Sequence, residues 1–229
     1  MWKARVFTLY PELFPGPLSS GIYKKALEKK IWSLEIVNIR DYALDKHKTV
    51  DDTPFGGGSG MVMRADVLAN SLDKNISDKN ESIFYLSPKG KKFDQSFAKK
   101  ILNENINIIC GHFEGVDQRL LETRNIKEVS VGDIVLSGGE IAAFLIIDTL
   151  VRLIPGVLGN SNSLSEETFE KNLLEYPQYT KPQKWEKKEV PGVLLSGDHA
   201  KIKSWRLAQS EDITRRRRPD LWEKYKKNK

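Results

Sequence analysis

The sequence has a single cysteine, Cys110, among its 229 residues, and this scarcity excludes two kinds of site. One thiol cannot form an intramolecular disulfide, and it cannot supply the sulfur ligands of a cysteine-based zinc site. Cys110 is therefore most simply a small core residue. The composition is typical of a protein from the reducing cytoplasm.

A long uninterrupted apolar segment is also missing. The most apolar stretch, residues 141–158, is broken by Asp148, Arg152 and Pro155, which predicts a buried helix and no membrane span. The first ten residues carry Lys3 and Arg5 and lack an apolar region with a cleavage site, so no secretory signal is expected.

Two common nucleotide-binding motifs are absent as well. The sequence holds no G-x-x-x-x-G-K-[ST] loop, and no G-x-G-x-x-G follows the first expected strand. Both absences weaken the case for a nucleoside triphosphate or for a dinucleotide bound in the usual way. The run Gly56-Gly57-Gly58-Ser59-Gly60 fits an anion-binding nest and equally fits a mobile loop.

The positive charge of the chain is concentrated in its last third. Residues 1–159 hold 21 Lys and Arg against 20 Asp and Glu, whereas residues 160–229 hold 16 against 11. Such an excess suggests a polyanion partner, because cations placed on phosphates release counterions. A solvated basic tail is the alternative.

The first 155 residues alternate expected strands and helices, which predicts an α/β fold with a mostly parallel sheet. Strands are expected at 3–9, 34–39, 83–86, 106–110 and 134–136, and helices at 22–30, at 95–103 with Asp94 as N-cap, and at 140–154. Further helices are expected from Asp198 to Gln209 and from Pro219 onward. We expect an α/β domain at 1–159, a flexible linker at 160–168 and a small helical domain at 169–229.

Three expected strands are followed by segments suited to holding a ligand against backbone. Residues 85–90, 110–115 and 131–139 all place glycine or proline near a strand end. Ligands of open α/β sheets bind outside the carboxyl ends of the strands, so the three loops together predict one pocket. Any one of them alone would be read as a tight turn.

The same segments carry a family resemblance. Tyr85-Leu86-Ser87-Pro88, Cys110-Gly111 with Glu114-Gly115-Val116-Asp117, Gly132-Asp133 with residues 135–140, and Ile154-Pro155-Gly156-Val157-Leu158-Gly159 resemble the bacterial tRNA (guanine-37-N1)-methyltransferases. Residues 49–61 and 191–200 are similar to that family too, so the match covers essentially the whole chain in order.

This resemblance implies a SPOUT-type fold in which the chain around residues 85–140 threads a deep trefoil knot. It implies a cytoplasmic homodimer with its active site at the subunit interface, S-adenosylmethionine as methyl donor, and the anticodon stem-loop of tRNA as partner. Magnesium dependence is implied by the resemblance alone, and its ligands are unknown. The expected donor-binding residues are Tyr85, Leu86, Ser87, Pro88, Gly111, Glu114, Val131, Gly132, Asp133, Ile134, Val135, Leu136, Gly138 and Gly139.

The implied reaction moves a methyl group to N1 of guanine 37 in tRNAs that also have guanine at position 36. Arg152 aligns with the family's catalytic arginine, and an ion pair with Asp148 at i,i+4 is the alternative. Glu167 is expected to be the general base, although the family has aspartate there. Glu166 is the runner-up, and a role of both at a helix N-terminus is the alternative.

The tRNA is expected to contact the basic helical domain. The expected residues are His199, Lys201, Lys203, Arg206, Arg215, Arg216, Arg217 and Arg218, whereas Trp205 and Trp222 are expected in the core. Three positions depart from the family pattern: His112 stands where arginine is usual, Phe113 where tyrosine is common and Gln118 where glutamate is common. Histidine cannot reproduce the forked geometry of arginine, so we expect a looser contact there. A non-catalytic RNA-binding protein and, more distantly, a nucleotide-dependent oxidoreductase are the rival functions.

Overall fold

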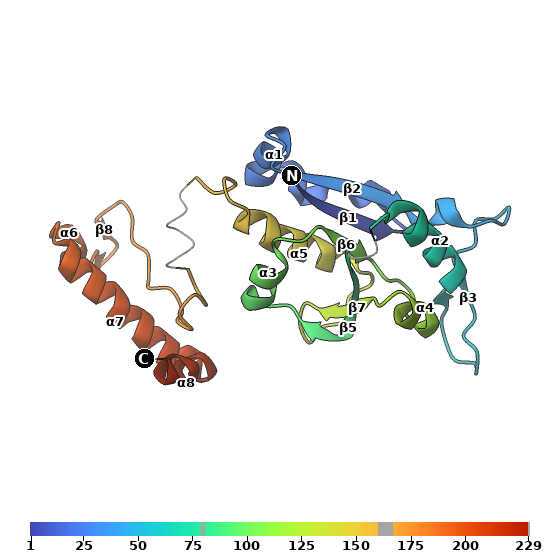
Figure 1. Ribbon diagram of the computed structural model, residues 1–229. Helices are drawn as coiled ribbons and strands as arrows, with labels where there is room; N and C mark the ends of the chain where they lie inside the picture. Colours follow the sequence, from blue (N-terminus) through green and yellow to red (C-terminus); the bar gives the residue numbers. More distant parts are fainter. Residues whose placement is uncertain (79–80, 160–166, 229) are drawn as a thin grey trace. The chain divides into compact units, whose positions relative to one another are not determined.

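The computed structural model describes residues 1–78, 81–159 and 167–228 (Figure 1). The chain folds into two compact units, residues 1–159 and residues 160–229. Most of the predicted linker lies outside the described residues, and only Glu167 and Thr168 of it belong to the described part. No described helix is long and apolar enough to cross a membrane.

A five-stranded sheet lies at the centre of the first unit. Its strand order is β2-β1-β6-β5-β7, and every neighbouring pair is parallel. The predicted α/β class with a mostly parallel sheet is therefore confirmed. All four residues of β6 are buried, as expected for a central strand covered on both faces. The strands are Trp2–Thr8 (β1), Trp32–Asn38 (β2), Ser82–Lys92 (β5), Ile106–Ile109 (β6) and Lys127–Ser130 (β7).

Helices cover both faces of this sheet (Figure 1). They are Gly21–Glu28 (α1), Ala65–Asn75 (α2), Gln95–Ile101 (α3), Gln118–Thr123 (α4) and Glu140–Leu153 (α5). Successive strand residues point to opposite faces. Accordingly, Phe7 of β1 packs in one apolar cluster with Leu68 of α2, whereas its neighbour Thr8 contacts Glu140 of α5. Helices α1 and α3 pack beside α5, and α4 packs beside α2.

Short elements connect these layers. Single 3-10 turns form at Pro11–Leu13, Gly16–Ser19 and Ile39–Tyr42. An antiparallel pair, Asp51–Asp52 (β3) and Val62–Met63 (β4), closes the loop that contains the glycine run 56–60. The Asp94 carboxylate accepts a hydrogen bond from the backbone N–H of Phe97 at 2.8 Å, which confirms the predicted cap of α3.

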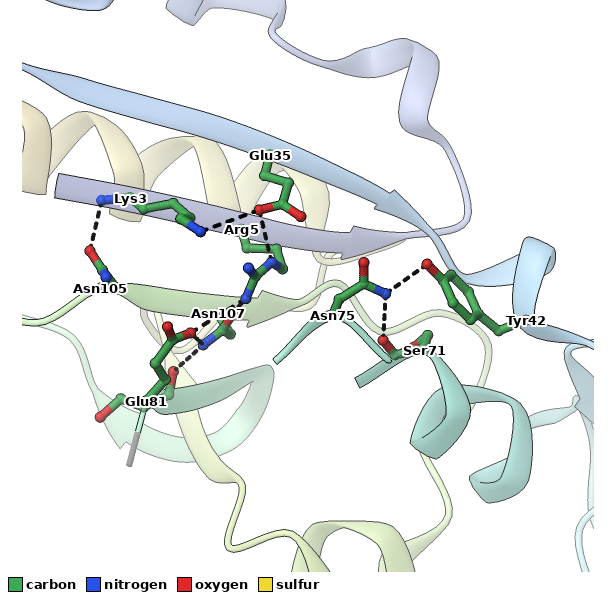
Figure 2. A network of polar contacts seen from close by, with 10 residues as sticks. Lys3, Arg5, Glu35, Tyr42, Ser71, Asn75, Glu81, Asn105 and Asn107 are labelled. Carbon is green, nitrogen blue, oxygen red and sulfur yellow. Dashed lines mark hydrogen bonds and ion pairs between the residues drawn. The ribbon is translucent and has the colours of Figure 1, made fainter. Parts of the chain in front are cut away.

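A buried charge within the sheet is held by a polar network (Figure 2). Arg5 of β1 is only 6% exposed, and its guanidinium donates to the side-chain oxygen of Asn107 on β6 at 2.8 Å. Glu35 lies 3.1 Å from its Nε, and Glu81 accepts from Asn107 at 2.9 Å. A buried cation needs such partners, because an unpaired one would cost several kcal/mol.

The second unit is mainly helical. Its elements are Lys184–Trp185 (β8), Lys188–Glu189 (β9), Gly192–Leu195 (α6), His199–Arg217 (α7) and Pro219–Lys227 (α8). Asp198 caps α7 by accepting from the N–H of Lys201 at 3.1 Å, and Pro219 opens α8, as predicted. Helix α7 continues past the predicted end at Gln209. Thr214, which is fully buried on α7, accepts the N–H of Leu174 at 2.7 Å and ties the preceding segment to the helix.

Two predictions about local structure are wrong. Residues 134–136 form no strand, since their side chains are exposed and a turn places the Ile134 N–H on the carbonyl of Gly132 at 2.9 Å. The fifth strand is instead Lys127–Ser130, on the edge of the sheet. Trp205 and Trp222 are half-buried rather than in the core.

Candidate active site

A cavity of about 330 Å³ opens at the carboxyl ends of β6 and β7 and beside residues 85–89, where the pairing of β5 with β7 is interrupted. Its walls are the segments that follow or interrupt these strands, namely residues 85–89, 111–116 and 128–139 together with the first turns of α4 and α5. This is the edge of a parallel sheet where the loops of neighbouring strands converge. The volume is in the range of small-molecule and cofactor sites.

The cavity brings together nearly all of the predicted donor-binding residues. Tyr85, Leu86, Ser87, Pro88, Gly111, Glu114, Val131, Gly132, Ile134, Val135, Leu136, Gly138 and Gly139 line it. Asp133 lies on the same loop but is exposed and outside the lining. The exposed apolar run at 134–136 thus forms a cavity wall, which explains why it does not pair as a strand.

Two glycines allow close approach of the walls. A Cβ on Gly111 would lie 2.5 Å from the Tyr85 ring, and a Cβ on Gly139 would lie 2.6 Å from the Cα of Cys110. The Gly139 N–H also donates to the carbonyl of Gly111 at 3.0 Å, so the loops after β6 and β7 touch backbone to backbone. A side chain at either position would push these walls apart.

A buried carboxylate lies beside the cavity at the start of α5. Glu140 is 3% exposed and accepts a hydrogen bond from the Thr8 hydroxyl at 2.6 Å. The Nε2 atom of His112, whose ring lines the cavity, is 2.9 Å from both carboxylate oxygens. The edge of the His112 ring packs against Tyr10, with the ring centroids 4.9 Å apart.

Burial controls the acidity of two groups next to the cavity. It raises the pKa of the Cys110 thiol well above its usual value, and the Glu140 carboxylate acts in the same direction. It also raises the pKa of Tyr85, with the Glu128 carboxylate as a second cause. Both groups therefore stay protonated and neutral around pH 7, and Cys110 is the core residue that was predicted.

Comparison with known proteins identifies the family. The family model described as tRNA (Guanine-1)-methyltransferase TrmD matches residues 2–224. The chain belongs to this family. It is 68% identical over 229 residues to the tRNA (guanine-N(1)-)-methyltransferase of Pelagibacter ubique, with 100% of both chains covered. It is 54% identical over 229 residues to the protein of the same name from Bartonella tribocorum, and 54% identical over 230 residues to that of a Chelativorans species, with 100% of this chain and 98% of each relative covered.

In this TrmD chain, the candidate catalytic arginine lies far along α5 from the cavity. Arg152 is in the last turn of α5, whereas Glu140 at the cavity is its first residue. At 1.5 Å per residue the two are separated by about 18 Å along the helix axis. Asp148, the alternative ion-pair partner of Arg152, accepts a hydrogen bond from the Tyr23 hydroxyl.

The two candidate bases differ in whether the structure describes them. Glu167 belongs to the second unit, where its carbonyl accepts the N–H of Glu170 at 3.2 Å. Glu166 lies outside the described residues. The alternative role of this pair at the start of a helix loses support, because residues 167–174 form turns.

The predicted tRNA-binding residues all lie on α7 or at its C-cap, Arg218. They follow the helix from His199, its first residue, to the arginines of its last turn, a length of about 28 Å at 1.5 Å per residue. Several are engaged: Arg206 stacks on the Tyr176 ring at 4.7 Å, Arg215 and Arg216 pair with Asp212, and Arg218 pairs with Asp220. Arg217 is exposed and has no carboxylate partner within the described part of the chain.

One part of the site was missed by the sequence analysis. Glu140 follows Gly138-Gly139 at the expected start of a helix. An acidic residue there is favourable through its interaction with the helix dipole alone, so it does not indicate a further role. Nothing in the spacing indicates that it meets Thr8 and His112, because these residues come from three distant segments. Among the described residues, no group of three or more His, Cys, Asp or Glu could hold a metal ion, so no magnesium site is found there.

Proposed function

We propose that the protein transfers a methyl group from S-adenosylmethionine to N1 of guanine 37 in tRNAs that have guanine at position 36. The observation that carries this proposal is the cavity between β5, β6 and β7, lined by nearly all of the residues expected to bind the donor in a chain of this family. The relatives that support it are named tRNA (guanine-N(1)-)-methyltransferases.

The cavity has the chemistry to bind such a donor. Adenine can be held by backbone N–H and C=O groups between the apolar walls of Leu86 and residues 134–136. Glu114 lines the cavity with an exposed carboxylate suited to ribose hydroxyls or to the cationic end of the ligand. When bound, the donor supplies an electrophilic methyl group on a sulfonium sulfur. The protein has to orient this group and exclude water from it.

Methylation of guanine N1 needs a base that accepts the N1 proton and a group that stabilises negative charge on guanine O6. Guanine N1 bears a proton at neutral pH, so the attack requires that proton to leave. In our proposal the Glu167 carboxylate accepts it, and the Arg152 guanidinium stabilises negative charge on guanine O6. General-base assistance of this kind is typically worth ~10² to 10⁴ in rate.

The active protein in this proposal is a homodimer with composite sites. Arg152 lies about 18 Å along α5 from Glu140, which is beside the cavity of its own chain, and in this proposal the arginine that meets a given donor comes from the second copy. An apolar face supports such pairing: Ile141 and Leu145, one helical turn apart on α5, are 63% and 46% exposed. The donor-binding unit is residues 1–159, and tRNA is held by α7 of the second unit.

The SPOUT-type trefoil knot belongs to the same proposal. It is supported by the direct contact between the loops after β6 and β7, where Gly139 donates to Gly111. A tRNA-modifying enzyme of this kind works in the cytoplasm. Because no ligand cluster is found in the described part of the chain, no step is assigned to magnesium.

A transfer assay tests the reaction and its site. Wild-type protein, incubated with S-adenosylmethionine labelled in the methyl group and an unmodified tRNA transcript, should label the RNA. A transcript with adenine at position 37 should stay unlabelled, and one with the position-36 guanine replaced should be labelled poorly. Equal labelling of all transcripts would contradict the site assignment. RNA binding without any labelling would favour the non-catalytic alternative.

A complementation assay tests the composite site. The variants Gly139→Ala, which damages the donor cavity, and Arg152→Ala should each lose most of their activity as homodimers. In a mixed dimer, the intact cavity of one chain would face the intact Arg152 of the other, so up to half of the wild-type activity per dimer should return. No recovery would show that Arg152 does not act across the interface.

Single-turnover rates at saturating donor and tRNA test the base. Glu167→Gln should slow methyl transfer by ~10² or more, whereas Glu167→Asp should keep much of the rate. Glu166→Gln is the matched control because it removes a neighbouring carboxylate. A loss in the control alone would transfer the role to Glu166, and wild-type rates in both would exclude this pair as the base.

A further inference from the structure

The His112 ring is seated between the two loops that form the floor of the donor cavity. It follows Gly111 in the loop after β6, and it reaches Glu140 at the end of the loop after β7. The ring lies directly against Gly138, where a Cβ would be 2.2 Å from its Cε1 atom and 2.7 Å from its Nε2 atom. Glycine at 138 therefore makes room for this ring.

Among the described residues, the side chains of Thr8 and His112 contact the Glu140 carboxylate. Glu140 is 3% exposed, and a polar group so deeply buried depends on its hydrogen bonds. Thr8 donates to Oε1, and His112 lies within 2.9 Å of both oxygens. Since the Thr8 hydroxyl reaches only one oxygen, His112 is the donor that links the carboxylate to the cavity side. The hydrogen on Nε2 follows from the carboxylate that faces it.

We propose that His112 is a positioning residue for the methyl donor, and that it acts through Glu140 by fastening the loop after β6 to the Gly138-Gly139 turn. This inference rests on the proposed donor site. Both loops contribute backbone to the cavity, so releasing one from the other changes the donor's binding surface. The described contacts that carry this role all lie within residues 1–159, and tRNA is proposed to be held by α7, so tRNA affinity should be unaffected.

Two amide replacements separate this role from simple packing. In His112→Gln the side-chain amide nitrogen reaches about as far as the imidazole Nε2, so it can still donate to Glu140. In His112→Asn the amide stops near the position of Nδ1 and falls short. The two variants are both neutral and polar and differ mainly in reach. His112→Ala removes the donor and the ring together.

Donor affinity is the main measurement, made by calorimetry with S-adenosylmethionine and with S-adenosylhomocysteine. Losing one hydrogen bond to a charged group should weaken binding by about 10- to 100-fold in His112→Asn and His112→Ala. The variant His112→Gln should stay within about threefold of wild type, and all variants should bind tRNA normally. In turnover, the loss should appear in KM for the donor more than in kcat.

A second perturbation tests the coupling to Glu140. Glu140→Gln keeps the shape and can still exchange one hydrogen bond with His112, and we expect an intermediate loss. The effects of His112→Ala and Glu140→Gln on donor affinity should then be non-additive, since both disrupt one contact. Thermal unfolding without ligand shows which variants are folded. If His112→Ala or Glu140→Gln fails to fold, the comparison of His112→Gln with His112→Asn decides whether His112 has the positioning role.

The outcomes separate this proposal from the proposed function. If wild type binds neither ligand, the donor site itself is wrong. If wild type binds both ligands and His112→Asn binds as well as His112→Gln, the positioning role is wrong and the donor site stands. Equal weakening of His112→Gln and His112→Asn would likewise overturn the role, because reach to Glu140 would not matter.

Discussion

Replacing Gly139 with alanine should damage the donor cavity through contact distance alone. Gly139 has φ −77° and ψ −10°, which alanine adopts without strain. A Cβ there would lie 2.6 Å from the Cα of Cys110 and 3.0 Å from the N of Gly111, whereas ordinary van der Waals contact begins at 3.4 Å. Both neighbours are backbone atoms at the end of a buried central strand, so they cannot rotate away as a side chain would.

The geometry gives the size of the effect. The two backbones would have to separate by about 0.8 Å to restore ordinary contact, and the 3.0 Å hydrogen bond from Gly139 to Gly111 would be stretched beyond useful length. Overpacking of this kind costs typically about 1–3 kcal/mol, or roughly 3–10 °C in Tm for a unit of this size. A misplacement near 1 Å at a reacting centre can cost about 10²-fold in rate, so kcat/KM for the donor should fall by about that factor.

Gly192→Ala is the matched control for this substitution. Gly192 opens α6, a Cβ there would have nothing within 4 Å, and the position needs no positive φ. Donor affinity by calorimetry, Tm by circular dichroism and single-turnover methyl transfer should be measured for both variants. Wild-type donor affinity and Tm in Gly139→Ala would refute the contact argument. An equal loss of donor affinity and Tm in Gly192→Ala would show that replacing any glycine with alanine has this effect and that the contact with Cys110 is not the cause.

Three further predictions concern other parts of the chain. Burial and the hydrogen bond to Asp148 raise the pKa of Tyr23 to about 12 in the folded protein. The protonated phenol therefore adds to the free energy of unfolding. This contribution is complete below about pH 10 and is lost as the pH rises toward 12. After discounting for solvent screening, we expect Tyr23 to contribute about 1 kcal/mol to the free energy of unfolding. Measured by denaturant unfolding, this free energy should fall less between pH 9 and pH 12 in Tyr23→Phe than in wild type. The buried Cys110 thiol should react with a disulfide reagent only after unfolding, and rapid labelling of the native protein would contradict its placement. Arg217→Ala should weaken many tRNAs alike and lower the slope of log affinity against log salt by about one, and an unchanged slope would show that this arginine is merely solvated.

The buried parts of the fold could be predicted from the sequence because burial leaves a pattern. The apolar runs of β1, β2 and β6 and the Asp94 and Asp198 caps follow from local chemistry and appear within a few residues of the expected bounds. The predicted mostly parallel sheet also follows from the alternation of strands and helices.

The errors occur where the usual link between apolar character and burial fails. Ile134, Val135 and Leu136 are 56%, 88% and 37% exposed, because they form the wall of an open cavity. Strand β7 begins with Lys127 and Glu128 and buries only its last two residues, as an edge strand does, so its sequence shows no apolar run. Periodicity can locate a core, but it cannot distinguish an apolar core strand from an apolar ligand wall.

In the proposed dimer, helix α5 would supply two distant parts of the methyl-transfer site. Its N-terminus carries Gly139 and Glu140 at the donor cavity, its C-terminus carries Arg152, and Ile141 and Leu145 leave an apolar face exposed between them. In a two-fold symmetric dimer each contact occurs twice with the roles exchanged. If two copies of α5 pair antiparallel through that face, Arg152 of one helix is carried past the midpoint of the contact toward the cavity end of the other helix. Arg152 would then lie far from its own cavity and on the side of the partner's cavity. A monomer would bind the donor but lack the arginine, so donor binding and methyl transfer should respond differently to dilution.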